Sequence, residues 1–328
     1  MKQPSKSFSE IISAGEEEKF ATYTNKLKAI QKAKSKKYGK GRLLHRKGLL
    51  ALKAEFQVDA NLPAHAAQGI FASPGKYEAI IRLSNGSLEV QADKTPDIRG
   101  FALKVKGVAG NSILTGKPTT EQDFVMINHT TFSSARAEEF LDLLLAISSG
   151  GGALLKHLYN SYGFFGMFKA MARFAKVIGK KFTSFATENF STVLPIRNGD
   201  YAVKLRIRPV SEVTTKPSKV DLTTDLKEHL KSGALEYAVE LQFYTDAETT
   251  PIEDASVEWP ESETAFVTVG KLTVPVQSFA GDAYEKFAAS VEQMKFDPWN
   301  AIEAHKPLGN IMRARKHAYY ASQIERGA

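Results

Sequence analysis

LALKAEFQV, residues 50–58, places apolar side chains at every second position, and this alternation predicts a half-buried strand. YEAIIRLS, residues 77–84, is rich in β-branched and aromatic residues and predicts a second strand. Arg82 and Ser84 lie on the same face of that strand, because successive side chains alternate between the two faces. Further strands are expected at residues 101–105, 123–128, 201–209, 235–245 and 265–274.

Helical composition separates and follows these strands. The helical segments are residues 8–37, residues 135–181 with an interruption at 148–152, residues 282–295 and residues 308–326. The chain has no regular alternation of strands with helices and no glycine fingerprint for a dinucleotide or a phosphate. The order of elements therefore predicts an α+β fold with a mainly antiparallel sheet.

The composition is that of an ordinary globular protein. The 328 residues are 43% apolar and 24% charged, which is enough for a substantial core. Cysteine is absent, which excludes disulfides, zinc–thiolate sites, iron–sulfur clusters and a cysteine nucleophile. Residues 1–18 show neither a continuous apolar stretch nor a small-residue cleavage site, so we expect a cytoplasmic protein.

Much of the net charge of +8 lies in residues 26–47, which hold many lysines and arginines. The most economical interpretation is a solvated helix face. Contact with nucleic acid or with an anionic membrane is the alternative. The segment has few interleaved aromatic residues, which argues against nucleic acid as a partner.

One of the seven histidines has unusual neighbours. His45 lies in GRLLHRKG, between a basic turn and the first strand, and no histidine forms a close metal-ligand pair. A serine hydroxyl such as that of Ser84 can fix the tautomer and orientation of an imidazole. Arg42 and Arg82 could together bind an anion such as a carboxylate. Spacing alone favours a simpler interpretation, an edge turn with solvated arginines.

The C-terminal helix holds a second pattern, in RARKHAYYASQIER. Arg315 and Tyr319 are four residues apart and lie on one helix face, which Ser322 and Arg326 continue. An adjacent guanidinium favours a phenolate, and tyrosine is a known ligand of haem iron. On spacing alone, an exposed amphipathic helix with a cation–aromatic contact remains the commoner outcome.

Five segments occur in an order that resembles the haem catalase family, in a shortened form. They are RLLHRKG (42–48), YEAIIRLSNG (77–86), PDIRGFALKVKGVAGN (96–111), VEWPESETAFVTVGKLTV (257–274) and RARKHAY (313–319). The resemblance is good over residues 42–132, fair over 257–320 and weak between them. It implies an antiparallel β-barrel wrapped by α-helices, with haem b between barrel and helices. The implied domains are a helical basic arm, 1–41, and a haem domain, 42–328, with a helical insertion at 135–181.

The resemblance also implies roles for single residues. His45 resembles the distal histidine above the haem, and Ser84 resembles its hydrogen-bond partner. Tyr319 resembles the proximal iron ligand, with Arg315 holding it as phenolate; Tyr320 is the nearest alternative ligand. Two arginines resemble the contacts of the haem propionates: Arg42 and Arg82.

Two segments depart from the family pattern. Catalases carry a distal asparagine where this chain has TGKPTTEQDFVMIN, residues 115–128. Alignment on the following strand places Glu121 near that position, with Thr120 or Gln122 as alternatives. The apolar and basic segment 151–181 is expected to be a core helix, with a channel lid or a membrane-touching helix as alternatives.

The implied function is a haem-dependent peroxidase that reduces hydrogen peroxide or organic hydroperoxides with an unidentified electron donor. Weak catalase activity and a homo-oligomeric state remain open. One alternative is a lipid hydroperoxide isomerase resembling the allene oxide synthases. Another is a non-catalytic protein that binds haem or an anionic surface.

Overall fold

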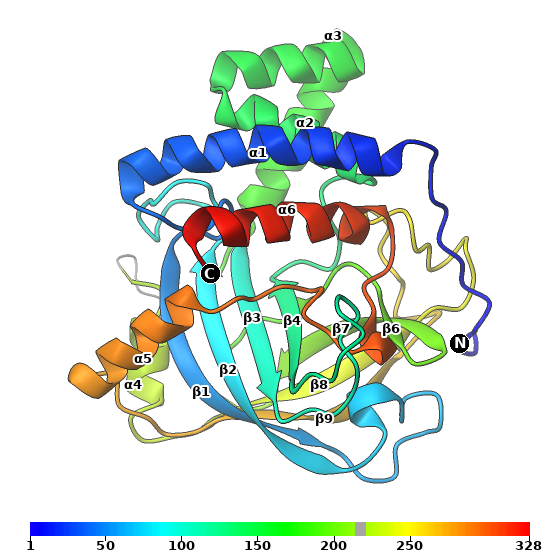
Figure 1. Ribbon diagram of the computed structural model, residues 1–328, viewed down its shortest axis with the longest axis vertical. Coiled ribbons are helices and arrows are strands. Elements are labelled where there is room, and N and C mark those ends of the chain that lie inside the picture. The colour runs from blue at the N-terminus through cyan, green and yellow to red at the C-terminus, as the bar shows by residue number, and fades with distance from the viewer. Residues whose placement is uncertain (214–220) are drawn as a thin grey trace.

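A computed structural model describes residues 1–213 and 221–328 of the chain (Figure 1). Its strands are β1 (Gly48–Val58), β2 (Gly75–Asn85), β3 (Arg99–Lys106), β4 (Glu121–Ile127), β5 (Phe190–Ser191), β6 (Ile196–Asn198), β7 (Tyr201–Pro209), β8 (Leu235–Phe243) and β9 (Phe266–Val274). Its α-helices are α1 (Glu16–Tyr38), α2 (Ala137–Ser148), α3 (Gly151–Ile178), α4 (Thr224–His229), α5 (Asp282–Gln293) and α6 (Asn310–Arg326).

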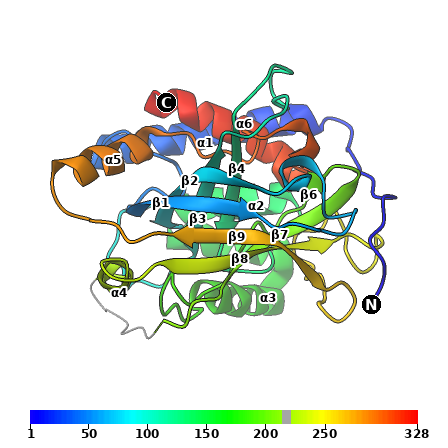
Figure 2. The same ribbon diagram turned by 90° about the horizontal axis from the view of Figure 1, so that it is seen from below.

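The strands form one antiparallel sheet that closes into a barrel. Neighbouring strands follow the order β5-β4-β3-β2-β1-β9-β8-β7-β6, and an additional pairing of β5 with β7 closes the ring. Figure 2 shows β1, β9 and β8 side by side across one wall of this barrel. The predicted α+β fold with an antiparallel barrel and surrounding helices is confirmed.

The alternation in β1 explains why this strand separates two layers. Leu52 and Phe56 point into the main core and are almost completely buried. Ala51, on the opposite face, belongs to a smaller buried cluster with Val291 of α5 and Phe296. The strand is therefore covered on both sides where α5 crosses it, as Figure 1 shows at the lower left.

Two long helices, α1 and α6, lie side by side over one end of the barrel (Figure 1). The predicted helix over residues 8–37 begins only at Glu16, directly after Gly15, whose φ of 71° is outside the helical region. Phe20 and Leu27 of α1 belong to the main core. Lys26 and Lys32 are exposed, as expected of a solvated helix face, whereas Arg46 near the end of the basic segment is buried.

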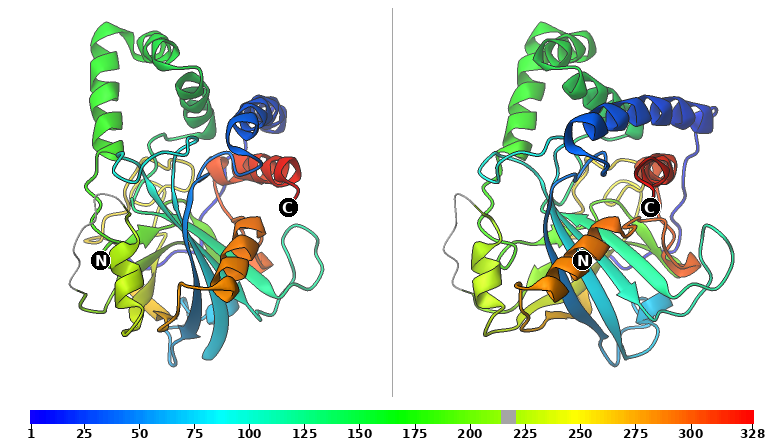
Figure 3. Two further views of the ribbon diagram at one scale, coloured as in Figure 1. Left: turned by 90° about the vertical axis from the view of Figure 1, so that its left-hand side faces the viewer. Right: turned by 60° about the vertical axis from the view of Figure 1, so that its left-hand side comes forward.

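The segment 151–181 is not a core helix, so that prediction is wrong. α3 projects beyond α1 and α2 at the end of the molecule farthest from the barrel (Figure 3). Gly163 interrupts it with φ 68° and ψ −179°, so α3 consists of two helical arms joined at a kink. No helix in the described part of the chain is long and apolar enough to cross a membrane.

Candidate active site

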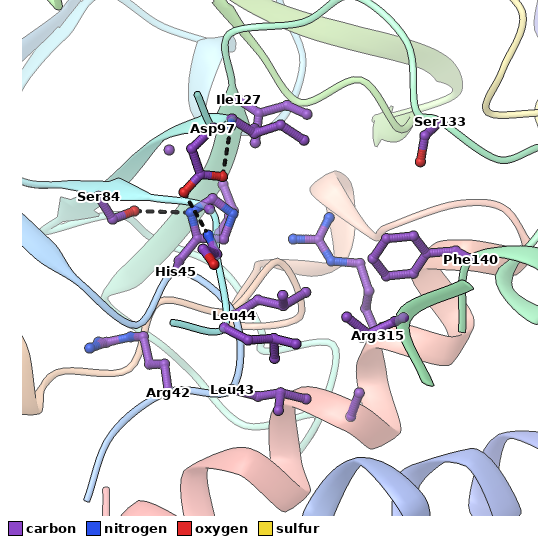
Figure 4. A pocket seen from close by; sticks show the side chains of 18 of the residues that line it. Arg42, Leu43, Leu44, His45, Ser84, Asp97, Ile127, Ser133, Phe140 and Arg315 are labelled. Atoms are coloured by element: carbon purple, nitrogen blue, oxygen red, sulfur yellow. Dashed lines mark hydrogen bonds between the residues drawn. The ribbon is translucent and has the colours of Figure 1, made fainter. Parts of the chain in front are cut away.

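A cavity of about 670 Å³ lies between the barrel and the helices α1, α2 and α6. Its size is typical of sites that bind small molecules or cofactors. Six of the seven predicted site residues line it: Arg42, His45, Arg82, Ser84, Arg315 and Tyr319. Figure 4 shows His45 and Ser84 near the strands and Arg315 on α6, so these side chains reach the cavity from different walls.

His45 is held by three hydrogen bonds. Its Nδ1 shares a bond of 3.0 Å with the Ser84 hydroxyl. Its backbone N–H donates to Gly86 O at 3.0 Å, and its carbonyl accepts a bond of 3.0 Å from Arg82 Nη2. The backbone of His45 has φ 52°, a left-handed conformation that costs free energy in a non-glycine residue. Such conformations concentrate at functional sites, where surrounding contacts maintain them.

Gly100 at the start of β3 is required by this arrangement. A Cβ atom at this position would lie 2.4 Å from His45 Nδ1 and 2.6 Å from Ser84 Oγ. Only glycine therefore allows β3 to pass this close to the imidazole. No role was predicted for Gly100, although the glycine in PDIRGFALK is the local signal in the sequence for such a close approach.

The surroundings of His45 keep its imidazole neutral. Burial, followed in importance by the positive charges of Arg82, Arg315 and Arg42, lowers the pKa of His45 to about 3. The ring is nevertheless partly accessible because it borders the cavity. Since Ser84 occupies Nδ1, the other ring nitrogen, Nε2, is left for a molecule in the cavity. A neutral imidazole there can accept a proton.

Tyr319 and Arg315 form the pair that helical spacing predicted. Arg315 Nη2 donates a hydrogen bond of 2.6 Å to the Tyr319 hydroxyl oxygen, and the guanidinium lies 4.9 Å from the ring centroid. Ser322 and Arg326 of the same helix also line the cavity. The next residue, Tyr320, is 67% exposed and lies outside the lining, so it is not an alternative ligand for this cavity.

The two arginines predicted to bind an anion do bind a carboxylate, that of Glu292 in α5. Arg42 Nη1 donates to Glu292 Oε1 at 2.6 Å, and Arg82 Nε donates to Glu292 Oε2 at 2.8 Å. Arg326 completes the cluster through the backbone oxygens of Glu292 and Met294. Among these side chains three guanidinium groups face one carboxylate, so the cluster retains an excess of positive charge. The sequence carries no local signal for Glu292, because it lies far from both arginines along the chain.

The structure does not bring Glu121 to the cavity, so its predicted place beside His45 is wrong. Glu121 pairs with Lys106 at one end of the β3–β4 ladder, whereas Gly100, beside His45, pairs with Ile127 at the other end. These ends are about 20 Å apart at the rise of a β-strand. Glu121 instead accepts a bond of 2.7 Å from Lys104. The described residues that line the cavity include neither Thr120 nor Gln122, and no asparagine.

His305 lies outside the cavity, and its buried imidazole leads us to expect that the free energy of unfolding depends on pH. Its Nε2 accepts a bond of 3.0 Å from Ile70 N–H, while its Nδ1 lies 3.1 Å from Arg197 O. Only neutral imidazole makes both bonds, and burial lowers the pKa of His305 to about 4. In the unfolded chain the His305 imidazole binds a proton below about pH 6.5, whereas in the folded chain it stays neutral until the pH reaches its lowered pKa. Between these two pH values, a fall in pH therefore favours the unfolded state. We expect this group alone to lower the free energy of unfolding by about 2 kcal/mol between pH 7 and pH 5.

Urea unfolding at these two pH values tests the expectation. His305→Gln should be less stable at pH 7 and should lose part of the pH dependence. Equal stability of the unmodified chain at both pH values would contradict the assignment of His305 as a buried neutral residue.

Comparison with known proteins supports the fold. No protein-family model matches the chain, and no curated protein is similar to it in sequence. Among solved structures, catalase A from Saccharomyces cerevisiae superposes with a TM-score of 0.67 at 18% identity, over 87% of this chain and 61% of that one.

Two further catalase structures superpose over the same share of this chain. A fungal catalase gives a TM-score of 0.65 at 17% identity, over 59% of its length, and a bacterial catalase gives 0.67 at 16%, over 57%. The chain thus spans about three fifths of the length of these catalases. At this level of identity the similarity concerns the fold, and the chain has the fold of the catalases.

Proposed function

We propose that the chain binds haem b in the cavity and reduces peroxides there. One observation carries this proposal: a neutral imidazole, His45, and a phenol oxygen, Tyr319, reach the same cavity from different walls. A tyrosine oxygen is a suitable ligand for ferric iron, and an imidazole across the cavity is suited to moving protons.

The residues present fit this cofactor. Tyr319 would bind the iron, with Arg315 donating a hydrogen bond to the ligand oxygen. The excess positive charge of Arg42, Arg82 and Arg326 suits the two propionates of haem. Apolar side chains from the helices and the barrel cover much of the remaining cavity wall, as an apolar macrocycle requires.

When bound, haem would supply the redox-active iron that the reduction of a peroxide requires. His45 Nε2 would accept a proton from one oxygen of the peroxide and donate it to the other oxygen, which departs as water or as an alcohol. Ser84 holds Nδ1, which keeps the lone pair on Nε2 directed at the cavity. Two electrons and two protons convert ROOH to ROH and water, and an external organic donor supplies the electrons.

The cavity favours organic hydroperoxides over hydrogen peroxide as substrates. α2 and α3 add an apolar wall of Phe140, Leu144, Ile147, Phe174 and Val177. No asparagine amide lines the described cavity to position a small, fully polar peroxide. The same wall would accommodate an acyl chain, which favours a lipid hydroperoxide isomerase as the second candidate function.

Reconstitution with haem tests both candidates. The purified chain should develop a Soret band on haem titration and consume cumene hydroperoxide and a fatty-acid hydroperoxide faster than hydrogen peroxide when a dye donor is present. Loss of the fatty-acid hydroperoxide without donor and without oxygen release would select the isomerase. Absence of a Soret band at saturating haem would contradict the proposal.

A further inference from the structure

The outer part of α3 carries a surface that the proposed chemistry does not use. Seven of its large side chains are exposed to solvent: Leu155 (45%), Tyr159 (54%), Tyr162 (54%), Phe164 (57%), Phe165 (81%), Phe168 (53%) and Met171 (39%). None of them lines the cavity. An apolar patch of this kind, with so many aromatic rings, usually marks an interaction site.

Three phenylalanines form the centre of this patch at the kink. The ring of Phe164 packs edge-on against Phe165 at 5.4 Å and against Phe168 at 5.3 Å. Gly163 places the kink at the outermost end of the molecule, where the two arms of α3 meet (Figure 3). The aromatic rings therefore stand at a projecting tip and lie outside any groove formed by the barrel.

The charge of the segment that carries the patch has one sign. Residues 151–181 contain six lysines and arginines and no aspartate or glutamate. Lys156, Lys169 and Lys176 on α3 are exposed. A second copy of this chain would bring an equally cationic surface to the patch, so repulsion opposes self-association through it. A partner whose surface is both anionic and apolar would match the positive charge of this segment and its exposed aromatic side chains.

The C-terminal end of α3 is fixed to the body of the protein. Phe174, Val177 and Ile178 contribute to the cavity wall, and Lys180, just beyond the helix, donates a bond of 2.6 Å to Asn128 O. The C-terminal part of α3 thus contributes to the cavity wall, whereas the kinked tip is exposed. This arrangement presents the apolar tip at a defined position on the molecule.

We propose that the tip of α3 docks on the surface of a lipid bilayer containing anionic lipids. The phenylalanines and tyrosines insert at the boundary between headgroups and acyl chains, and the lysines contact lipid phosphates and carboxylates. Amphipathic helices that combine aromatic residues with lysines bind membrane interfaces in this way. The inference goes beyond the proposed function, because it requires neither haem nor peroxide turnover.

Co-sedimentation with vesicles tests the docking. The probes are vesicles of phosphatidylcholine alone and of phosphatidylcholine mixed with phosphatidylglycerol, each at low and at high salt. We expect the chain to bind the mixed vesicles at least about tenfold more tightly than the neutral ones, and salt to weaken the binding. Equal binding to neutral and to mixed vesicles, or no binding to either, would overturn the proposal.

Two variants measure separately what the aromatic side chains and the lysines contribute to vesicle binding, and a third variant serves as the control. The triple change Phe164→Ser, Phe165→Ser and Phe168→Ser should lower the affinity for mixed vesicles at least about tenfold. Changing Lys156, Lys169 and Lys176 to Glu should remove the preference for anionic lipid. Changing the exposed Lys286 and Lys295 to Glu, on and beside α5, removes positive charge elsewhere and should have a much smaller effect.

Two further measurements keep the result interpretable. All changed residues are exposed, so circular dichroism should show unaltered folding of the variants. The mass of the free chain in solution should be that of one copy or unaffected by the phenylalanine changes. A dimer that those changes dissociate would assign the patch to self-association and overturn the docking proposal.

Discussion

Tyr319→Phe is expected to abolish stable haem binding. The change removes the oxygen that accepts the hydrogen bond from Arg315 at 2.6 Å and leaves the ring in place. Under the proposed function that oxygen is the iron ligand, so its loss should lower haem affinity at least about tenfold and shift the Soret band of any haem retained. Haem titration followed by absorbance measures both effects.

The neighbouring tyrosine provides a matched control. Tyr320→Phe removes the same group from the next residue of α6, but Tyr320 is largely exposed and lies outside the cavity lining. The absorption spectrum of the Tyr320→Phe variant with haem should be the same as that of the unmodified chain with haem. An unchanged spectrum in Tyr319→Phe, or a loss of haem in Tyr320→Phe, would contradict the assignment of Tyr319 as the ligand.

His45→Gln is expected to lower peroxide turnover by about 10²–10⁴-fold while haem remains bound. Glutamine can still make a hydrogen bond but cannot take up and return a proton near neutral pH. Haem content and the rate of hydroperoxide consumption should be measured on the same sample. His229→Gln, on a histidine remote from the cavity, is the control and should retain full turnover.

The pH profile gives an independent check on His45. Since burial and the nearby arginines lower its pKa to about 3, the unmodified chain should show no loss of turnover from His45 protonation between about pH 8 and pH 5. A fall in turnover centred near the ordinary histidine pKa would show that another group moves the proton. Retention of full turnover in His45→Gln would exclude His45 as the acid–base group.

The arginine cluster shows why an anion site can have more than one occupant. Glu292 binds Arg42 and Arg82 directly, yet Arg326 adds a third buried guanidinium to the same edge of the cavity. Burial and the neighbouring Arg82 lower the pKa of Arg42 to about 9. Additional anionic groups would offset this mutual repulsion, which is the electrostatic argument for carboxylates of a cofactor at this edge.

Local patterns predicted much of the fold. Alternation of apolar side chains located β1, and β-branched and aromatic composition located β2. The strands expected at β3, β4, β7, β8 and β9 also lie within a few residues of their predicted bounds. The short elements β5, β6 and α4 were not predicted, since a strand of two or three residues has too few positions to show a period. The pairing of β5 with β7 that closes the barrel is a contact between distant segments and has no local signature.

The candidate site likewise contains some contacts that the sequence predicts and others that only the fold sets. The contact between Arg315 and Tyr319 follows from helical geometry alone, because residues four apart share a face. The motif order led to His45 and Ser84, which the fold then joins at 3.0 Å. The predicted place of Glu121 was wrong because it came from aligning the sequence on the following strand, whereas the register between β3 and β4 decides where the side chain lies.

The sequence by itself therefore determined the features whose contacts are local: the longer strands, the paired Arg315 and Tyr319, and the cationic charge of residues 151–181. Only the tertiary structure decided which distant groups meet. It places Gly100 against His45, Glu292 between two arginines, and the aromatic tip of α3 in solvent. The physical reason is that repeating backbone geometry sets neighbours within an element, whereas strand register, barrel closure and helix packing set neighbours between elements.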